Sequence, residues 1–518
     1  MNLLKQNMVL AFLLTLMPSA VLADQVTISS PDGVTSIAGE LMSFDDETYV
    51  LSTSIGELRL SRAWTVCTGQ ACPDVAKELE LAISTNEIDA SGLLRDLIDG
   101  FVGTRNLSGT STSDGGDTGV HIDLKDKSTE DNAGSVDVSI QPFDAGFTQL
   151  SDGTIDMYLS TSRVPDAIAE QKVAAGQVDL RDGERERVIA LDALVPVVHP
   201  DNPIRSVSLD ALAQIAAGRI KNWSELGGPD AAIRMVLPAA GSHLDQAFSE
   251  LVLEPNRVRL RSNVERSESE TQAAADVAAD LAAITVTSLS GRGSAEVLPI
   301  RQSCGPLAYA SDFAIKAEEY PLSLRVYAYT AEDSQTPFKA DFLDYMSSPD
   351  GQSLIEATGY VGQKIVTQPV SLQGTRMASA LLSADTTETL ALLKNFARDL
   401  GAADRLSTTF RFSSASSDLD TKSQADVERM VSYLNNADVR NRDILVIGFS
   451  DDVGRFDLNE RLAMLRATSV RDALVAAPGG TELAERITIS AYGPLAPVGC
   501  NDSSKGRESN RRVEIWIR

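Results

Sequence analysis

The sequence predicts a multidomain α/β protein with three parts: a small N-terminal β module, a larger α/β domain, and a C-terminal α+β domain with the order βαβαββ. Three observations carry this prediction. The chain has 518 residues, enough for two or three domains. Short alternating apolar runs fill residues 24–74, which is typical of antiparallel strands. Strand-like and helix-like runs then alternate over residues 75–366 and again over residues 409–518.

The charge balance limits the partners of the chain. It carries 73 acidic and 46 basic residues, a formal net charge of −27. Such an acidic protein repels nucleic acid and anionic membrane surfaces, and we expect neither as a partner. A few local donors can still bind a small anion, because nearby charge-assisted hydrogen bonds outweigh a distant field.

The first 23 residues have the pattern of a secretory signal peptide. Lys5 precedes an apolar run from Met8 to Met17, and small residues lead to a cleavage site between Ala23 and Asp24. No cysteine follows the run directly, which argues against a lipoprotein anchor. No later stretch reaches the roughly eighteen apolar residues that a membrane helix needs. We therefore expect a soluble protein that is exported to the periplasm.

The predicted β module ends in two closely spaced cysteines. In an exported protein the spacing of Cys67 and Cys72 predicts a local disulfide. A zinc site would need further ligands, and the three histidines of the chain lie far apart in sequence. Cys304 and Cys500 either bridge two domains or stay unpaired, and the sequence leaves both open. The module shows no catalytic group, so we expect it to pack against the rest of the chain or to bind an envelope protein.

Alternating strands and helices begin near residue 75. Strand-like runs occur at Leu79–Ile83, Val136–Ile140 and Asp156–Leu159, and an amphipathic helix is predicted over Ile88–Phe101. Alternation of this kind implies βα units and a parallel sheet.

The middle of this domain carries a distinctive sequence. It begins ERVIALDALVPVVHPDNP and continues with LAQIAAGRIKNWSELGG at Leu212–Gly228, and the later segments SSPDGQ and GYV fit the same pattern. This sequence resembles the phosphate-type periplasmic substrate-binding proteins of ABC transporters over residues 75–366. The resemblance implies a periplasmic-binding-protein-like domain of two α/β lobes joined by a hinge, with a small anionic ligand between them.

An anion in such a cleft is held by hydroxyl groups, by backbone N–H groups at helix N-termini and often by one arginine. The candidate ligand-binding residues are Thr85 with Ser84 beside it, Ser160, Ser162, Arg163 and Ser242. Each hydroxyl can equally be an ordinary helix cap, and the sequence leaves both interpretations open.

The sequence departs from this family at one helix start. The family carries Ser-Gly-Thr where this chain has Ser242-His243-Leu244, and Pro238 stands where an arginine is common. Fewer anion donors remain, so we do not expect tight binding of inorganic phosphate. A periplasmic hydrolase is the remotest alternative, because no G-x-S-x-G sequence is present and adjacent residues do not readily present serine and histidine to each other. We expect no enzyme activity.

Residues 367–408 are predicted to form a helical linker, since apolar residues recur there at helical spacing. The last domain, residues 409–518, has the pattern strand, helix, strand, helix, strand, strand. In its final strand, Val513–Ile517, apolar residues alternate with Glu514 and Trp516, which predicts a half-buried strand.

The stretch Ile444–Arg466, ILVIGFSDDVGRFDLNERLAMLR, carries the clearest functional signal. Its apolar start predicts a buried strand, its middle a turn with two carboxylates, and its end a helix with Leu458, Leu462 and Leu465 on the apolar side. Arg466 falls within the apolar sector of this helix, and a buried charge needs a partner.

Asp451 is the nearest candidate partner of Arg466 in sequence. The two can form an internal ion pair that orients the loop against the helix. Alternatively, Asp451 binds the ammonium and Arg466 the carboxylate of a zwitterion such as an amino acid backbone. Each charge-assisted hydrogen bond of this kind contributes about 1.5–3 kcal/mol. The spacing alone leaves both interpretations open.

The same region resembles the OmpA-like peptidoglycan-binding domain. GFSDDVGRFDLNERLAMLRA, AYGPLAP and NRRVEI follow one another in the order of that family. The resemblance implies that Asp451 and Arg466, with the family's separation (466 − 451 = 15), bind the diaminopimelate of a peptidoglycan stem peptide. It also implies that Asn459, Asn510 and Arg511 line the same groove.

Together these features predict a non-catalytic binding protein of the Gram-negative periplasm, associated with the cell wall or outer membrane. We expect peptidoglycan binding by the C-terminal domain and binding of a small anionic solute by the two-lobed domain, with no cofactor and no metal. A wall-bound protein cannot shuttle freely to a permease, which favours a sensor or scaffold. The alternative is the phosphate- or oxyanion-binding component of an ABC transporter.

Overall fold

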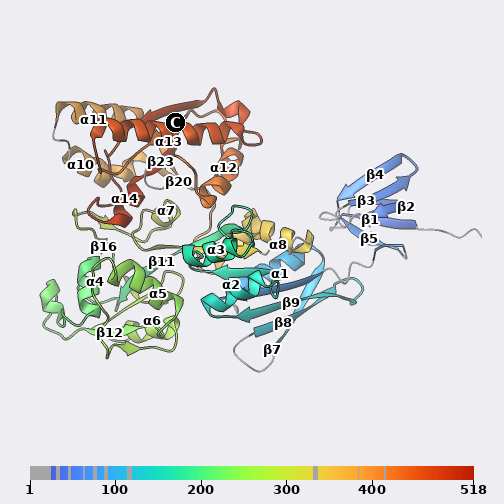
Figure 1. Cartoon of the computed structure of the whole chain (residues 1–518), viewed down its shortest axis with the longest axis horizontal. Helices are drawn as coiled ribbons and strands as arrows, with labels where there is room; N and C mark the ends of the chain where they lie inside the picture. The colour runs from blue at the N-terminus through green and yellow to red at the C-terminus, as the bar shows by residue number, and fades with distance from the viewer. Residues whose placement is uncertain are drawn as a thin grey trace, which may run out of the picture. The chain divides into compact units, whose positions relative to one another are not determined.

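The computed structural model describes residues 25–30, 35–44, 48–61, 65–69, 71–73, 79–86, 92–113, 119–330, 337–382, 384, 386–412 and 416–518. It divides into two compact units, Met1–Lys77 and Glu78–Arg518, which are described separately (Figure 1). The predicted signal peptide, residues 1–23, lies outside the described residues. The predicted class, a multidomain α/β protein, is confirmed.

The N-terminal unit is one antiparallel sheet in the order β4-β3-β2-β1-β5. Its strands are β1 (Gln25–Ser29), β2 (Ser36–Phe44), β3 (Thr48–Thr53), β4 (Gly56–Ser61) and β5 (Val66–Thr68). Alternate residues of β1 and β3 point to one face, where Val26, Ile28, Tyr49 and Leu51 form a small core. Cys67 of β5 is joined to Cys72 by a disulfide.

The larger unit begins with the first lobe of a two-lobed domain. Its elements are β6 (Glu80–Thr85), α1 (Leu93–Thr104), β7 (Leu107–Ser113), β8 (Gly119–Asp126), β9 (Asn132–Ile140), α2 (Phe143–Ser151), β10 (Met157–Ser160), α3 (Asp166–Ala174), α8 (Pro337–Ser347) and α9 (Pro349–Ala357). The helix predicted over Ile88–Phe101 corresponds to α1, which buries a stripe of apolar residues against the sheet.

The second lobe is built around β12, β13 and β14. Its elements are α4 (Leu209–Ala216), η3 (Trp223–Leu226), β12 (Arg234–Leu237), α5 (His243–Phe248), η4 (Ser249–Leu253), β13 (Glu265–Arg266), α6 (Glu270–Ala278), β14 (Ala283–Ser288), β15 (Glu296–Val297), β16 (Ile300–Arg301), β17 (Leu307–Ala308) and α7 (Asp312–Lys316).

Two long strands connect the lobes: β11 (Glu186–Val198) and β18 (Ser323–Thr330). The first half of β11 pairs with β18 and the second half with β14, so one sheet runs through both lobes in the order β13-β12-β14-β11-β18-β10-β6-β9-β8-β7. The predicted parallel pairing occurs at β6–β9, β6–β10, β12–β13 and β12–β14. The connecting strands and the β7–β8–β9 ladder are antiparallel, so the sheet is mixed.

The C-terminal domain has a five-stranded sheet in the order β19-β20-β23-β21-β22. Its elements are β19 (Thr367–Pro369), η5 (Val370–Gln373), α10 (Gly374–Leu382), α11 (Thr387–Asp399), β20 (Asp404–Arg411), α12 (Thr421–Leu434), β21 (Ile444–Gly448), α13 (Phe456–Ala476), η6 (Thr481–Leu483), β22 (Ile487–Ala491), α14 (Ser504–Asn510) and β23 (Arg512–Ile517).

The segment expected to be a linker, residues 367–408, is an integral part of this domain. Its ends form β19 and most of β20, so the expected boundary at residue 409 falls inside a strand. Its helices α10 and α11 supply apolar residues to a second core, in which Trp516 is fully buried. The half-buried pattern predicted for the last strand is therefore wrong: α12 and α13 cover one face of the sheet, and α10 and α11 cover the other.

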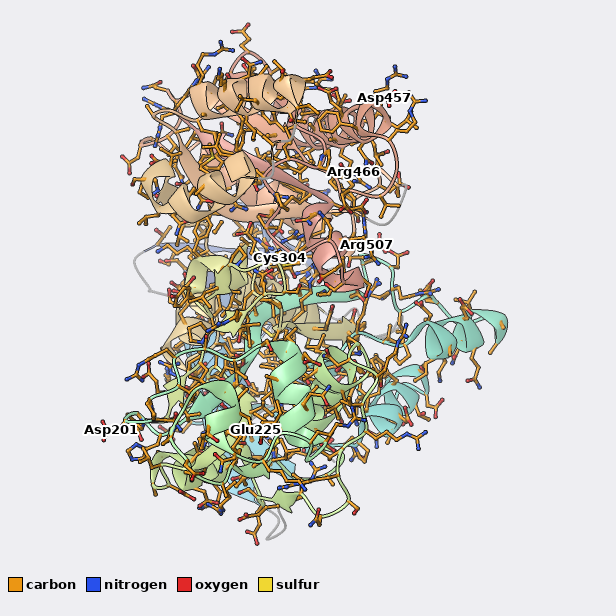
Figure 2. The ribbon with its side chains drawn as sticks, turned by 90° about the vertical axis from the view of Figure 1, so that its left-hand side faces the viewer. Asp201, Glu225, Cys304, Asp457, Arg466 and Arg507 are labelled. Atoms are coloured by element: carbon orange, nitrogen blue, oxygen red, sulfur yellow. A yellow bond between two sulfur atoms is a disulfide. The ribbon has the colours of Figure 1, made fainter. Side chains whose placement is uncertain are left out.

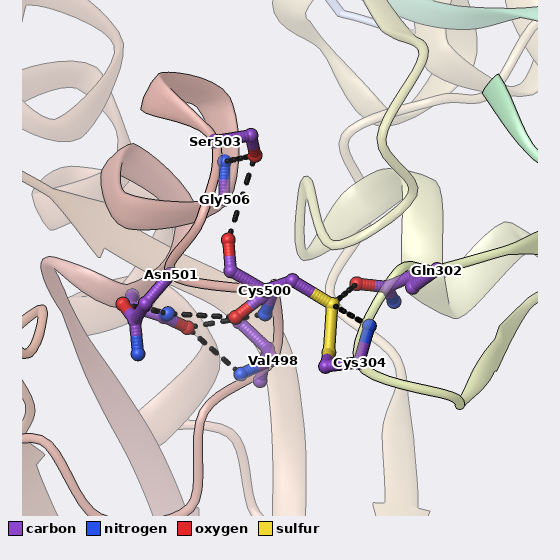
Figure 3. Close-up of a disulfide and its surroundings, with 9 residues drawn as sticks. Gln302, Cys304, Val498, Cys500, Asn501, Ser503 and Gly506 are labelled. Atoms are coloured by element: carbon purple, nitrogen blue, oxygen red, sulfur yellow. Dashed lines mark hydrogen bonds between the residues drawn. A yellow bond between two sulfur atoms is a disulfide. The ribbon is translucent and has the colours of Figure 1, made fainter. Parts of the chain in front are cut away.

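The C-terminal domain is covalently linked to the two-lobed domain. A disulfide joins Cys304, in the β16–β17 hairpin of the second lobe, to Cys500 in the loop before α14 (Figure 3). Buried Arg405 pairs with Glu319 at the same junction. Disulfides that close long loops restrict the unfolded chain most, so this bond stabilises the junction.

Polar contacts extend this junction to the strands that connect the two lobes. Arg325 of β18 pairs with Asp420 at 3.1 Å. The hydroxyl of Thr421 donates to the carboxylate of Glu186 on β11 at 2.6 Å. The start of α12 therefore lies against the strands that join the two lobes.

In the part of the chain that the structure describes, no helix has both the length and the apolar character to cross a membrane.

Candidate functional site

The end of β21 brings Asp451 close to α13. The helix approaches the strand so closely at Gly448 that a Cβ atom there would lie 2.0 Å from the carbonyl oxygen of Ala463, and only glycine fits. The loop that follows turns at once, because the carboxylate of Asp451 accepts a hydrogen bond from the backbone N–H of Val453 at 3.1 Å. This turn holds the Asp451 side chain at the mouth of the loop.

Helix α13 buries Arg466 on its inner face. This face also carries Asn459, Ala463, Ala467, Val470 and Leu474. The predicted leucine face is wrong, since Leu458 and Leu465 are 53% and 59% exposed. The neighbouring positions Ala463, Ala467, Val470 and Leu474 point inward instead, with Ala463 where the helix comes closest to Gly448. In Figure 2, Arg466 lies in the lower half of the C-terminal domain, above Arg507 and Cys304.

Asp451 has Arg511 as its hydrogen-bonding partner. The guanidinium of Arg511 donates to the Asp451 carboxylate at 3.0 Å, and the two side chains are only 15% and 13% exposed. Arg511 also donates through Nε to the carbonyl oxygen of Phe412 at 3.2 Å. From the sequence, Arg466 was the expected partner of Asp451. The observed partner is instead Arg511, which lies 60 positions from Asp451 in the chain.

Arg466 lies near this ion pair, since the charges of both Arg511 and Asp451 act on it. Its Nε donates to the carbonyl oxygen of Ser416 at 3.0 Å, and its guanidinium lies 5.3 Å from the centre of the Phe412 ring. Burial, together with the positive charge of Arg511, lowers the pKa of Arg466 to about 10, and Asp451 opposes this effect. The structure thus gathers one carboxylate and two guanidiniums, which we call the Asp451 cluster: Asp451, Arg466 and Arg511.

The Asp451 cluster differs from the open pair that the zwitterion interpretation assumed. Arg466 is fully buried, and Asp451 is already neutralised by Arg511. A ligand therefore has to replace existing contacts, namely the Arg511–Asp451 hydrogen bond and the Ser416 carbonyl.

Two other expected groove residues have structural contacts. Asn510 is fully buried, and its amide oxygen accepts from the N–H groups of Val498 and Gly499 at 2.9 and 3.1 Å. Its amide nitrogen donates to Gly499 and Asn501, so it fixes the loop before α14 and does not line a groove. Buried Asn459 donates to the carbonyl oxygen of Val453 at 3.1 Å and so holds the Asp451 loop.

A cavity of about 770 Å³ lies beside this cluster. The first lobe contributes residues between Thr161 and Pro165, the second lobe contributes residues from Gln246 to Leu251, and the start of β18 contributes residues up to Tyr327. The C-terminal domain supplies the remaining wall, including Phe412, Ser416 and Arg511.

The charged groups of the cavity wall are balanced in sign. The five basic residues are Arg163, Arg325, Arg411, Lys505 and Arg511. The five acidic residues are Glu250, Glu318, Asp418, Asp420 and Glu508.

Several of these wall charges neutralise one another. Arg325 pairs with Glu318 at 2.5 Å and with Asp420 at 3.1 Å. Burial alone would raise the pKa of Glu318, but the guanidinium of Arg325 outweighs it and holds that pKa well below the ordinary carboxyl value. Arg163 is 46% exposed and donates to Glu186 at 2.8 Å. The wall is thus polar but nearly neutral.

The five expected small-ligand residues divide into three groups. Thr85 and Ser160 are fully buried at the ends of neighbouring strands, where Leu159 pairs with Thr85. Ser162 and Arg163, in the loop after β10, line the cavity.

Ser242 does not line the cavity. It accepts from the N–H of Asp245 at 3.3 Å and so acts as the N-cap of α5. The structure therefore brings four of the five candidates to one strand edge, and for Ser242 it favours the helix-cap interpretation.

The sequence did not predict most of the cavity-lining residues that the C-terminal domain contributes, including Arg411. This arginine is buried and donates to the carbonyl oxygens of Glu318, at 2.9 Å, and Ser509. No local signal pointed to it, because in a strand a residue between Phe410 and Phe412 points to the face opposite the two rings.

Comparisons with known proteins divide the chain in the same way. Residues 102–350 match the model of the PBP superfamily domain, and residues 411–511 match that of the OmpA family. The phosphate-binding protein PstS of Borreliella burgdorferi is 26% identical over 200 residues, covering 36% of this chain and 68% of that protein.

The C-terminal domain has its own relatives. The probable lipoprotein YiaD of Escherichia coli is 44% identical over 72 residues, covering 14% of this chain and 32% of that protein, so the match spans about a third of the relative. Among solved structures, an ABC-type phosphate transport receptor from Vibrio cholerae aligns with a TM-score of 0.40 and 18% identity, covering 54% of this chain and 99% of that chain.

Proposed function

We propose that this chain, which joins a PBP-like domain to a C-terminal OmpA domain, binds peptidoglycan through the Asp451 cluster and acts in the periplasm as a non-catalytic sensor or scaffold. The observation that carries the proposal is the gathering of one carboxylate and two guanidiniums at the end of β21. This set matches the charges of diaminopimelate, whose free end carries an ammonium and a carboxylate.

Binding would occur by exchange of partners. A ligand ammonium takes the place of Arg511 at the Asp451 carboxylate. The ligand carboxylate then accepts hydrogen bonds from Arg511 and from Arg466, in place of the Ser416 carbonyl. At Asp451 one cation replaces another, and at Arg511 one carboxylate replaces another, so these largely buried protein groups keep partners of the same charge type. At Arg466 the ligand carboxylate replaces the neutral Ser416 carbonyl.

Several features support a place in the cell envelope. The first 23 residues carry a signal-peptide pattern, and relatives of the C-terminal domain are named as a lipoprotein and an outer membrane porin. The relatives of the binding domain are named as binding proteins. A domain held at the wall cannot shuttle to a permease, which favours a sensor or scaffold over high-flux uptake.

Sedimentation of the full-length protein with purified sacculi tests the proposal. Asp451→Asn and Arg466→Ala should each weaken binding about tenfold or more, the effect of losing one charge-assisted hydrogen bond. Asp452→Asn changes the adjacent, exposed carboxylate, and Arg471→Ala removes an arginine whose Nε bonds the neighbouring Asp472. Both should sediment like the wild type. Equal sedimentation of all four variants would refute wall binding through this cluster.

A second candidate function is phosphate binding by the PBP-like domain. It is favoured by the match to the PstS proteins of Borreliella burgdorferi and Bacillus subtilis, which are named as phosphate-binding proteins. The Ser242-His243-Leu244 sequence argues against it, because Ser242 caps α5 and does not line the cavity. Thermal unfolding tests this function in millimolar phosphate and, as a control, in sulfate at the same concentration. A rise in Tm with phosphate but not with sulfate would establish phosphate binding.

A further inference from the structure

We infer that the cavity between the lobes and the C-terminal domain binds a zwitterionic peptide, namely the stem peptide whose diaminopimelate occupies the Asp451 cluster, and not a lone oxyanion. This inference rests on the proposed function and extends it from one amino acid to the ligand of the whole cavity.

The first argument is that the cavity and the cluster share their walls. Arg511 lines the cavity and is also hydrogen-bonded to Asp451. Phe412 and Ser416 line the cavity on one side, and on the other they contact the guanidinium of Arg466. A ligand that displaces the Ser416 carbonyl from Arg466 would therefore leave the rest of its chain in or beside the cavity.

The second argument is size. A volume of about 770 Å³ lies in the upper part of the range of about 300–1,000 Å³ typical of pockets for organic ligands of several residues or rings. A single tetrahedral oxyanion would fill only a small part of it. A peptide of a few residues matches it much better.

The third argument is charge. The wall carries five basic and five acidic side chains, so its formal charge is zero (5 − 5 = 0). Sites for compact oxyanions surround the ion with excess donors and positive charge. A balanced wall instead suits a ligand that carries both signs, as a peptide with free amino and carboxyl groups does. Phe143, Tyr320 and Phe412 supply apolar area for its carbon chain.

The fourth argument is that covalent and polar contacts across the junction hold the wall in place. The Cys304–Cys500 disulfide joins the second lobe to the C-terminal domain. Arg411 donates to the backbone of the segment before β18, and Thr421 to Glu186 on β11. The cavity is therefore a built feature of the junction, and one ligand in it touches both lobes and the C-terminal domain. Occupancy by a wall peptide would in this way be transmitted to the hinge, as a sensor requires.

Titration calorimetry with the full-length protein tests the inference. The probes are the stem tripeptide L-alanyl-γ-D-glutamyl-meso-diaminopimelate, free meso-diaminopimelate and inorganic phosphate. Glu250→Gln and Gln246→Ala change exposed wall residues of the second lobe, where neither change leaves a buried partner. Each should weaken the tripeptide about tenfold, the effect of one lost hydrogen bond to a charged group, and leave free diaminopimelate unchanged.

Matched controls lie on the same lobe outside the cavity wall. Glu254→Gln alters an exposed carboxylate on the next turn, and Gln272→Ala alters an exposed amide of α6. Both should bind the tripeptide like the wild type. The inference is overturned if the wild type does not bind the tripeptide, if phosphate binds and the tripeptide does not, or if Glu250→Gln and Gln246→Ala match their controls. Failure of the proposed function is a separate outcome, seen as unchanged sacculus binding by Asp451→Asn and Arg466→Ala.

Discussion

The guanidinium of Arg511 donates a 3.0 Å hydrogen bond to the carboxylate of Asp451, and Arg511 also forms part of the wall of the interdomain cavity. One side chain thus belongs both to the Asp451 cluster and to the junction with the two-lobed domain. The Asp451 carboxylate and the Arg511 guanidinium are both mostly buried. If one of them is removed, water therefore cannot fully replace its hydrogen bond to the other. The proposed ligand therefore has to supply an ammonium and a carboxylate together in order to replace this ion pair.

Replacing Arg511 should reveal this requirement. Arg511→Ala leaves Asp451 without its hydrogen-bonding partner, so we expect a loss of about 1–3 kcal/mol in unfolding free energy and sacculus binding weakened about tenfold or more. Arg511→Lys keeps the positive charge but loses the guanidinium, which donates to both Asp451 and Phe412. Its sacculus binding should therefore be weaker than that of the wild type and stronger than that of Arg511→Ala. Sedimentation isotherms and chemical denaturation measure both effects. Wild-type binding by Arg511→Ala would show that the arginine is only structural.

The sequence predicted the elements of this site better than its contacts. The order of β21, the Asp451 loop and α13 could be read from the chain, because local composition determines strand, turn and helix. The Asp451–Arg511 hydrogen bond could not be read, since it joins residues that only the fold brings together. The fold class was predicted for the same local reasons.

The errors have one physical source, the close packing of neighbouring elements. Leu458 and Leu465 looked like core residues, but α13 approaches β21 closely at Gly448 and turns Ala463 and Ala467 inward in their place. Glu514 and Trp516 looked exposed because the helices that cover them, α10 and α11, lie in a segment expected to be a linker. Tertiary packing thus overrode the helical and strand periodicity.

The interdomain disulfide should stabilise the junction. Cys304→Ser with Cys500→Ser removes a bond whose cysteines are 196 positions apart, and we expect a loss of about 2–4 kcal/mol in unfolding free energy. Hydrogen exchange should become faster in the β16–β17 hairpin and in the loop before α14. The control is Cys67→Ser with Cys72→Ser, which opens only a short loop of the N-terminal sheet and should leave exchange at the junction unchanged. Unchanged exchange in both double variants would show that the polar contacts alone hold the domains together.

Glu514 should dominate the acid sensitivity of the C-terminal domain. Its carboxylate is fully buried and lies 2.7, 2.8 and 3.2 Å from the guanidiniums of Arg512, Arg376 and Arg405. Burial alone would raise the pKa of Glu514, but the arginines outweigh it and lower that pKa. The stability that Glu514 contributes is therefore complete above the ordinary carboxyl pKa of 4.5 and is lost as the pH falls below it.

Glu514→Gln tests this relationship by thermal unfolding. The variant leaves buried arginines without their carboxylate, so we expect a loss of about 3–5 kcal/mol at neutral pH. Its Tm should also fall less than that of the wild type when the pH is lowered from about 6 to about 3. Glu482→Gln, at an exposed position of η6, should behave like the wild type. Parallel pH profiles for wild type and Glu514→Gln would contradict the prediction.

Asp192 should have the opposite pH dependence. This buried carboxylate on β11 accepts hydrogen bonds from the Ser290 hydroxyl at 2.8 Å and the Leu289 N–H at 3.0 Å. Burial, with the nearby charge of Glu270, raises the pKa of Asp192 to about 6 from the ordinary 3.8. The folded state therefore holds this proton more tightly than the unfolded state, so stability is lost as the pH rises from 3.8 to 6, by about 3 kcal/mol.

Asp192→Asn removes the ionisation while its amide oxygen can still accept from Leu289. The Tm of the variant relative to wild type should therefore increase between about pH 4 and pH 7, because only the wild type has to bury a charge at the higher pH. The expected gain is several degrees, about 5 °C for a 3 kcal/mol change. Asp201→Asn removes an exposed carboxylate of the same lobe and should show no such gain. If the Tm difference for Asp192→Asn is the same at both pH values, Asp192 is already ionised in the folded protein at pH 4, and its hydrogen bonds outweigh burial.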